Sequence, residues 1–443
     1  MKKYASILIC ALLVICMFSS CKKAKETESS YSFFSVYDDI PNKSESKSKI
    51  SGKENKKSSN HTVSSVSTGL GEIIDIKIDK SDLKQVETAK IRVKQDRLTV
   101  FSYLSSSRQE IYKKMLKAAE DFTEGWIDLG NLGSDKEKVR SDIAVAYQAL
   151  GDDYPELFWL PASYYISSSS DQTAICFSGN ISGTKCSYLV SKSKVASMKK
   201  ELEEKAEEIV KATENISTQY EVELYLHDYL CENTEYDLNS EFKYTAFGAL
   251  VSKKAVCEGY SRAFAMLCSK AGINSFIMRG TSRNQNHSWN LVNIENSWYN
   301  IDITWDDQTS SGAKSALYSY FNLTDAEILS DHTAAPFINP KSGIIPNDGV
   351  YNLTEIPCSD SNMNYFNKEK LILENNNYDD LSNAISIQNS KNKKFAQIKV
   401  NPAISEDPSE IMRKMSESLK RCAGISLKSM STVDGTNYLL IRW

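Results

Sequence analysis

The chain has 443 residues, of which 41% are hydrophobic and 25% charged, a composition typical of globular proteins. Single domains commonly hold roughly 100–200 residues, so this length indicates two or three compact units. Lys+Arg 53 against Asp+Glu 57 leaves a formal net charge of -4, and nothing in this balance favours binding to nucleic acid.

The N-terminus has the pattern of an export signal. Two lysines follow Met1, and an apolar run then extends from Ile7 to Phe18. As a helix this run would cover about 18 Å, well short of the ~30 Å hydrocarbon core of a bilayer, so it fits the core of a signal peptide better than a spanning helix. We therefore predict a signal peptide over residues 1–20.

The cysteine that follows this run is a candidate for lipidation. Ser19 and Ser20 directly precede Cys21, and small residues before a cysteine resemble the lipobox of bacterial lipoproteins. Phe18 departs from the leucine that usually stands three residues before that cysteine, and an ordinary secretory signal with an incidental Cys21 is the alternative. We expect lipidation of Cys21. No other apolar run in the sequence is long enough to span a bilayer, so the lipid would be the only membrane attachment. The protein would then be exported and anchored in the cell membrane by its lipid.

Composition and periodicity divide the rest of the chain. Residues 21–70 are rich in Ser, Lys, Asn and Glu, a composition that buries too little apolar surface to fold, and we expect a disordered tether. An N-terminal α+β domain is expected over residues 71–215, a catalytic domain over 216–340 and a small C-terminal α/β domain over 341–443.

The expected N-terminal domain combines amphipathic helices with short strands. Two helices are indicated by apolar residues at helical spacing, and a longer charged helix follows them. These residues are Ile111, Met115, Ala119 and Phe122, then Val139, Ile143, Tyr147 and Leu150 with Gly151 ending that helix, then Val195, Met198, Leu202 and Ile209. Strands are expected at Tyr164–Ser168, Ala174–Phe177 and Cys186–Val190.

A cysteine at a predicted helix start is the candidate nucleophile. Cys257 precedes a helical stripe of apolar residues that begins at Tyr260, and Gly272 is placed to end this helix. Backbone N–H groups at a helix start stabilise a thiolate and can also hold an oxyanion. Cys268, about 16 Å further along the same helix, is too distant for a disulfide and reads as a core residue.

Histidine is rare in this chain, so acid–base chemistry near neutral pH is easy to localise. His61 lies in the expected tether, His332 follows a polar loop, and His227 lies on a helix with an apolar stripe. Only His287 lies in a strand pattern that faces other polar candidates.

The segment around His287 reads as a β-hairpin with Glu295 and Asn296 at its turn. In that register His287 lies opposite Thr304, and Asp302 is its diagonal neighbour on the same face, within reach of an imidazole. The hairpin thus predicts a base that is held by an orienting acid.

A turn shifted by one residue, to Asn296 and Ser297, would instead place His287 opposite Asp306. Asp306 and Asp307 are therefore the rivals for the acid's role. We favour Asp302, because Asn296 is the residue better able to take a positive φ at the second turn position.

Seven cysteines remain when Cys10 and Cys16 are removed with the signal and Cys21 carries lipid. An odd number leaves at least one free thiol in the chain. No Cys-x-x-Cys pair or repeated framework occurs, so neither a zinc ribbon nor a disulfide scaffold is indicated. We predict no metal and no cofactor.

The C-terminal stretch carries no catalytic constellation. A strand is expected at Phe395–Val400, a helix with Ile411, Met415, Leu419 and Cys422, and a last strand at Tyr438–Trp443. We expect a small α/β unit and assign it no function.

These motifs together resemble the bacterial transglutaminase-like domain, a papain-like cysteine superfamily. The resemblance covers roughly residues 220–310 and brings Cys257, His287 and Asp302 in order with their neighbours. The matching motifs are Ala255-Val256-Cys257-Glu258-Gly259-Tyr260, His287-Ser288-Trp289-Asn290 and Trp298-Tyr299-Asn300-Ile301-Asp302-Ile303-Thr304-Trp305-Asp306.

The resemblance implies a papain-like core, in which a helix carrying the cysteine packs on an antiparallel sheet carrying histidine and aspartate. It also implies acyl transfer through a thioester. Glu258 stands where animal transglutaminases have a tryptophan after the nucleophile, so calcium dependence and protein cross-linking are not implied. A second oxyanion donor is needed beside the Cys257 amide, and Tyr236 is a candidate by its place upstream; the alternative is a buried core tyrosine.

Two functions are compatible with these residues. In the first, Cys257, His287 and Asp302 form the triad of an acyl-transfer enzyme that acts on amide, peptide or isopeptide bonds of proteins or of peptidoglycan peptides. In the second, the domain is a non-catalytic cell-surface module that binds peptide or cell-wall material. A binding role would not require all three residues, so the sequence favours the enzyme.

Overall fold

The structure, a computed structural model, describes the folded part of the chain with a few gaps. The described residues are 72–74, 78–91, 98–161, 163–181, 184–283, 285–307, 316–334, 356–433 and 437–443. The predicted signal peptide, Cys21 and the predicted tether lie outside them, so these remain predictions. No helix among the described residues is both long and apolar enough to span a membrane.

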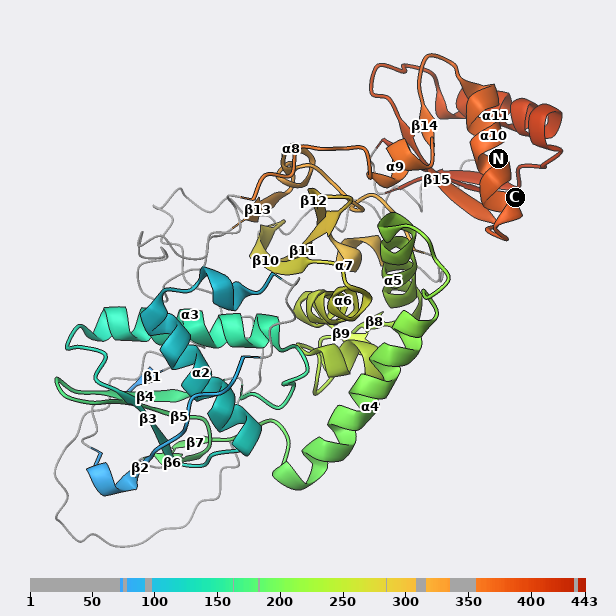
Figure 1. The fold of residues 1–443 in the computed structure, drawn as a ribbon. Coiled ribbons are helices and arrows are strands. Elements are labelled where there is room, and N and C mark those ends of the chain that lie inside the picture. Colours follow the sequence, from blue (N-terminus) through green and yellow to red (C-terminus); the bar gives the residue numbers. More distant parts are fainter. Residues whose placement is uncertain are drawn as a thin grey trace, which may run out of the picture. The chain divides into compact units, whose positions relative to one another are not determined.

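The N-terminal region is an α+β unit around a five-stranded sheet (Figure 1). The strand order is β1-β4-β5-β3-β2, with antiparallel β4–β5 and β5–β3 pairs at its centre. Its strands are β1 Glu72–Ile73, β2 Leu83–Lys84, β3 Trp126–Gly130, β4 Tyr165–Ser168 and β5 Thr173–Cys176. Two helices, α2 Ser106–Asp121 and α3 Lys136–Asp153, pack on each other, and 3-10 turns cover Lys80–Asp82 and Val100–Tyr103.

Helix α3 confirms one sequence prediction and corrects another. Val139, Ile143 and Leu150 are buried, as their spacing predicts, and Asp135 caps the helix by accepting hydrogen bonds from two backbone N–H groups. However, Gly151 does not end the helix, which continues to Asp153. A Cβ at Gly151 would lie 2.9 Å from Arg262 Nη1, so this glycine serves a close approach rather than a cap.

A small hairpin follows the sheet and differs from the strand expected at Cys186–Val190. Strand β6 Gly179–Ile181 pairs with β7 Thr184–Cys186, and the chain after Cys186 is not a strand. Helix α4 Lys192–Lys211 then begins close behind, as predicted. The expected strand was therefore wrong in its extent, because only its first residue belongs to a ladder.

Two thiols of this region lie together. Cys176 Sγ and Cys186 Sγ are 3.8 Å apart and both side chains are buried. We expect glutathione disulfide to oxidise them to an intramolecular disulfide, releasing two molecules of reduced glutathione. Mass spectrometry should then show a loss of about 2 Da, and digestion should give one linked peptide pair. Cys176→Ser should abolish the linkage, and an unchanged mass in the unaltered protein would refute the expectation.

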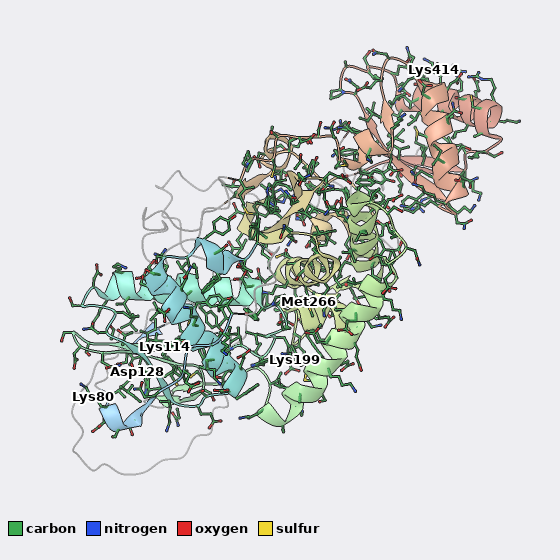
Figure 2. All side chains as sticks on the ribbon, viewed as in Figure 1. Lys80, Lys114, Asp128, Lys199, Met266 and Lys414 are labelled. Atoms are coloured by element: carbon green, nitrogen blue, oxygen red, sulfur yellow. The ribbon has the colours of Figure 1, made fainter. Side chains whose placement is uncertain are left out.

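The central region places a helix across an antiparallel sheet. Helix α6 Cys257–Ala271 packs against β10 and β11, and Met266, labelled in Figure 2, is one of its buried side chains. The sheet order is β12-β11-β10-β13, and its strands are β10 Ser275–Ser282, β11 Gln285–Ile294, β12 Ser297–Ile301 and β13 His332–Ala334. Around it lie α5 Gln219–Asn233, β8 Glu235–Tyr236, a π-helical turn Gly248–Ser252, β9 Lys254–Ala255, α7 Ile303–Asp306 and α8 Asp325–Ile328.

The C-terminal region combines helices with a small sheet, and its expected boundary as a separate domain stays a prediction. Its sheet has the order β14-β15-β17-β16. The elements are α9 Tyr365–Lys368, β14 Ile372–Leu373, α10 Tyr378–Ser390, β15 Phe395–Val400, α11 Pro408–Ala423, β16 Ser429–Thr432 and β17 Tyr438–Arg442. The predicted strand Phe395–Val400 is confirmed, while α10 was not predicted.

Candidate active site

Cys257 is the first residue of α6, as the sequence predicts. Val256 before it is extended, and the N–H groups of Gly259 and Tyr260 bond back to the Val256 carbonyl, so the helix starts at this cysteine. The helix start is tightly packed: a Cβ at Gly259 would lie 2.4 Å from the Lys243 carbonyl oxygen. This explains why a glycine stands two residues after the cysteine. The Cys257 side chain itself is only 8% exposed.

The predicted register of the hairpin is confirmed. Strands β11 and β12 pair from Ile294 with Ser297 to Asn290 with Ile301, which leaves Glu295 and Asn296 as the turn. Both turn residues have positive φ, 52° and 69°, as a two-residue hairpin turn requires. The rival register, with Asn296 and Ser297 at the turn, is therefore wrong.

The hairpin is shorter than expected, yet it still joins the histidine to the acid. Strand β12 ends at Ile301, and Asp302 caps the short helix α7 by accepting a hydrogen bond from the Trp305 N–H at 3.2 Å. Thr304 is helical and does not pair with His287. The end of the strand turns the Asp302 carboxylate toward β11, where Oδ2 lies 2.5 Å from His287 Nε2.

The charges of this pair stabilise each other. Burial alone would lower the pKa of His287, but the adjacent Asp302 carboxylate outweighs it and raises the pKa to about 10. Burial would likewise raise the pKa of Asp302, yet His287 and His332 lower it to about 2. The pair is therefore an imidazolium and a carboxylate at neutral pH.

The third group of the predicted set is also in reach. The Cys257 side chain lies close enough to His287 to raise the pKa of the imidazole further, after the larger effect of Asp302. The structure thus brings Cys257, His287 and Asp302 together in the order that the sequence predicts.

His332 is a site residue that the sequence reasoning passed over. It begins β13, where it lies opposite Ser282 of β10 and is buried. Its Nε2 lies 3.1 Å from Asp302 Oδ2, the same oxygen that His287 contacts. A Cβ at Gly280 would lie 2.0 Å from the Thr333 carbonyl, so a glycine in β10 permits β13 to approach. The rarity of histidine was the only sequence signal for this residue.

His287, Asp302 and His332 also have ligand atoms within 4.8 Å of one another, as a cation site would. Both imidazoles instead donate toward one carboxylate oxygen, which satisfies all three groups by hydrogen bonding. We therefore assign this cluster to acid–base chemistry and name no metal for it.

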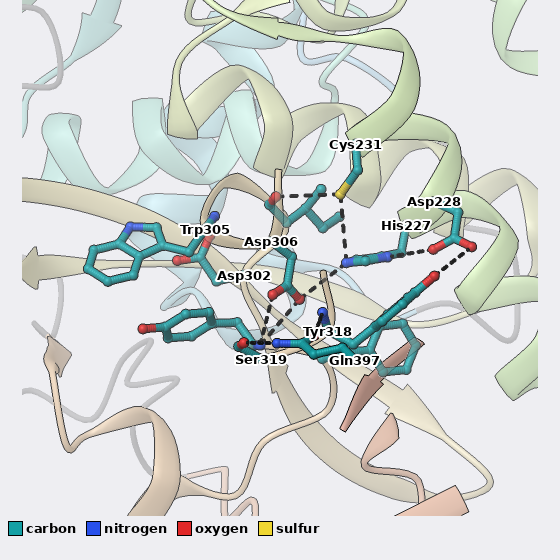
Figure 3. A network of polar contacts seen from close by, with 12 residues as sticks. His227, Asp228, Cys231, Asp302, Trp305, Asp306, Tyr318, Ser319 and Gln397 are labelled. Atoms are coloured by element: carbon teal, nitrogen blue, oxygen red, sulfur yellow. Dashed lines mark hydrogen bonds and ion pairs between the residues drawn. The ribbon is translucent and has the colours of Figure 1, made fainter. Parts of the chain in front are cut away.

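The rival acid Asp306 belongs to a second buried network, shown in Figure 3. Asp306 Oδ2 lies 3.3 Å from His227 Nε2, and His227 Nδ1 lies 3.1 Å from Asp228 Oδ1. Burial raises the pKa of Asp306 to about 6 although His227 opposes that rise. Cys231 Sγ lies 3.8 Å from the same Nε2, and burial raises the pKa of this thiol to about 12. The network resembles a triad in composition, but its cysteine is 1% exposed and faces the protein interior.

Asp307, Tyr236 and Cys268 are the other residues that the sequence singled out. Asp307, the second rival, accepts a 2.5 Å hydrogen bond from the Tyr260 hydroxyl. Tyr236 pairs with Ala255 in the β8–β9 ladder and is 46% exposed, so it is not the core tyrosine of the alternative reading. Its role as an oxyanion donor stays a prediction. Cys268 is fully buried, as expected of a core residue.

Glu258, which replaces the tryptophan of animal transglutaminases, lies in a buried ion cluster. Its carboxylate accepts hydrogen bonds from Arg262 Nε at 2.8 Å and Arg279 Nη2 at 2.6 Å. Arg279 also makes a two-pronged contact with Asp152 of α3, at 2.6 and 2.9 Å. Despite burial, the two arginines lower the pKa of Glu258 to about 2. This cluster ties the nucleophile's helix to β10 and to the N-terminal region.

Comparison with known proteins agrees with this arrangement. The sequence model of the transglutaminase-like superfamily matches residues 205–303. Kyphoscoliosis peptidase of Mus musculus and that of Homo sapiens are each 27% identical to the chain over 128 residues, covering 24% of this chain and 19% of theirs. The chain thus spans about a fifth of the length of these relatives.

Among solved structures, one described as a TGase is similar at 14% identity, over 40% of this chain and 50% of its own, with a TM-score of 0.23. The family match includes the nucleophile's helix, the hairpin and Asp302, which are the elements that form the site. Residues 205–303 are therefore similar to the transglutaminase-like superfamily, and this segment carries Cys257, His287 and Asp302.

Proposed function

We propose that the protein is a cysteine acyl-transfer enzyme that acts on amide, peptide or isopeptide bonds of protein or cell-wall peptide substrates. The observation that carries the proposal is the hydrogen bond between His287 and the buried Asp302, with Cys257 close to His287 at the start of α6. The lipid expected at Cys21 would hold this site at the membrane, outside the cytoplasm. The family of the core and the printed name of the curated relatives, a peptidase, support cysteine chemistry on peptide bonds.

In the proposed reaction the Cys257 thiolate attacks the carbonyl carbon of the substrate, and a tetrahedral intermediate forms. The His287 imidazolium gives its proton to the leaving amine as the C–N bond breaks, which leaves a thioester on Cys257. Water or a second amine, deprotonated by neutral His287, then attacks the thioester and releases the thiolate. Backbone N–H groups at the start of α6 are suited to the oxyanion, with the Tyr236 hydroxyl as the proposed second donor.

Asp302 would act through His287 in this scheme. The carboxylate orients the ring through its contact with Nε2, and its charge stabilises the imidazolium. Because Asp302 is fully buried, water does not screen this interaction. A non-catalytic binding module, the alternative, would have no use for such a buried charged pair at a cysteine.

Selective alkylation of Cys257 tests the proposal without a known substrate. We expect iodoacetamide at neutral pH to label Cys257 at least about tenfold faster than Cys422, because a thiolate beside an imidazolium reacts where a neutral thiol does not. Cys422 is the fair comparator, since it is exposed whereas Cys257 is largely buried. Labelling is quantified by residue with mass spectrometry.

His287→Gln should remove the advantage of Cys257, with circular dichroism showing that the variant is folded. Labelling of Cys257 at or below the rate of Cys422 in the unaltered protein would contradict the proposal. Incubation with peptide and cell-wall libraries, followed by identification of the acyl group trapped on Cys257, would then define the substrate.

A further inference from the structure

The Asp302 carboxylate contacts two histidines. His287 Nε2 and His332 Nε2 both lie within hydrogen-bonding distance of Oδ2, at 2.5 and 3.1 Å, while Oδ1 accepts from the Trp305 N–H. Rotation of the carboxylate about its last bond would break both histidine contacts at once. The contact with His332 thus restrains the carboxylate, and His332 has no part in the proposed reaction.

Both ring nitrogens of His332 contact a carboxylate. Its Nδ1 lies 2.6 Å from Asp331 Oδ1, and the other Asp331 oxygen accepts a 2.6 Å hydrogen bond from the Tyr320 hydroxyl. Carboxylate oxygens only accept, so His332 makes both of its contacts only with hydrogen on both ring nitrogens. In that form it is a cation beside Asp302.

The charged groups near this carboxylate come from several elements. His287 on β11 and His332 on β13 favour its ionised form, and Asp306 on α7 opposes it, since Asp302 raises the pKa of Asp306 by charge repulsion. Asp331 lies beyond His332, on the side away from Asp302. The Arg283 guanidinium stacks on the Trp305 ring, 3.9 Å from its centroid, next to the same site.

We propose that His332 is a positioning residue, which holds the Asp302 carboxylate ionised and aimed at His287. Burial of a carboxylate is costly unless hydrogen bonds and opposite charge compensate it, and His332 supplies both. It also leaves Oδ2 oriented toward β11 whichever protonation state His287 passes through. This inference rests on the proposed function, since it concerns the acid of that site.

The test is the pH dependence of Cys257 alkylation by iodoacetamide in the full chain. Alkylation falls at low pH because the Cys257 thiolate gains a proton, and an imidazolium that Asp302 holds in place beside the thiolate moves that fall to lower pH. We expect His332→Ala to move the half-point of this fall upward by about one to two pH units, the effect of one hydrogen bond to a charged group. His332→Gln keeps a donor without the charge, so its half-point should lie between those of His332→Ala and the unaltered protein.

His227→Gln is the matched control. His227 is also fully buried and also lies between two carboxylates, Asp228 and Asp306, but it does not contact Asp302. Loss of a buried histidine should lower the stability of the His332 and the His227 variants alike. The half-point of Cys257 alkylation should nevertheless stay unchanged in His227→Gln. If His332→Ala does not fold, His332→Gln carries the comparison.

Two results would overturn the inference in distinguishable ways. An unchanged half-point in folded His332 variants, with Cys257 still activated, would show that His332 only supports the fold and would leave the proposed function intact. A Cys257 that shows no activation in the unaltered protein would overturn the proposed function and this inference with it.

Discussion

Asp302→Asn is expected to lower turnover, and the selective alkylation of Cys257, by about 10²–10³-fold. Asparagine keeps the size of the side chain but cannot stabilise the imidazolium, and its amide can donate to His287 and favour the wrong tautomer. The same change costs about 10⁴ in a serine-protease triad. We expect a smaller loss here, because a thiolate–imidazolium pair depends less on the acid than a serine hydroxyl does.

Asp306→Asn and Asp307→Asn are the controls for this change. Each should lower Cys257 alkylation per folded molecule by less than about tenfold, because Asp306 contacts His227 and Asp307 contacts the Tyr260 hydroxyl. Circular dichroism should confirm that all three variants are folded, and Asp306→Asn is expected to be the least stable, since it disturbs the fully buried network of Figure 3. A silent Asp302→Asn beside a damaging Asp306→Asn would show that the acid has been misassigned.

The same pair has a signature in stability against pH. The pKa of His287 is raised from 6.5 to about 10, so its contribution is complete below about pH 6.5 and is lost as the pH rises through 10. The pKa of Asp302 is lowered from 3.8 to about 2, so its contribution is present above about pH 4 and is lost as the pH falls through 2. The difference in unfolding free energy between the unaltered protein and Asp302→Asn should therefore be largest between about pH 4 and 6.5.

The parts of the site that the sequence predicted are those with local causes. The turn at Glu295 and Asn296 follows from which residues tolerate positive φ, and it sets the register that leads His287 to Asp302. The start of α6 at Cys257 follows likewise from a stripe of apolar residues and a glycine at its end. The prediction failed where it extended the second strand of the hairpin past Ile301. Strand β12 ends there because Asp302 caps a helix.

The parts that the sequence did not predict depend on contacts between distant segments. His332 contacts Asp302 because β13 pairs with the edge of β10 that does not pair with β11. No local sequence pattern predicts this pairing. Similarly, Gly151 looks like a helix end until Arg262, more than 100 residues later in the chain, is seen to pass beside it. Sequence periodicity carries no information about such partners.

The largest expected effect on stability concerns Glu258. Removing one partner of a buried ion pair leaves the other charges uncompensated, which typically costs about 3–5 kcal/mol. Glu258 is 1% exposed, and its loss would remove the carboxylate that both Arg262 and Arg279 contact. We therefore expect Glu258→Ala to lower the free energy of unfolding by about 3–5 kcal/mol at pH 7, measured by denaturation in urea.

Glu208→Gln provides the comparison, because Glu208 forms an ion pair with Lys205 of similar length, 2.6 Å, but its side chain is 68% exposed. Exposed pairs contribute little, so this variant should change the free energy of unfolding by less than about 1 kcal/mol. The pKa of Glu258, lowered from 4.5 to about 2, gives the sign of the pH dependence: its contribution is present above about pH 4.5 and is lost as the pH falls through 2. Equal effects of the two substitutions would mean that Glu258 is not part of a tightly packed ion cluster. If only Glu258→Ala is destabilising, and Cys257 of the folded variant keeps its alkylation profile, then the residue beside the nucleophile serves to dock its helix rather than to act on the substrate.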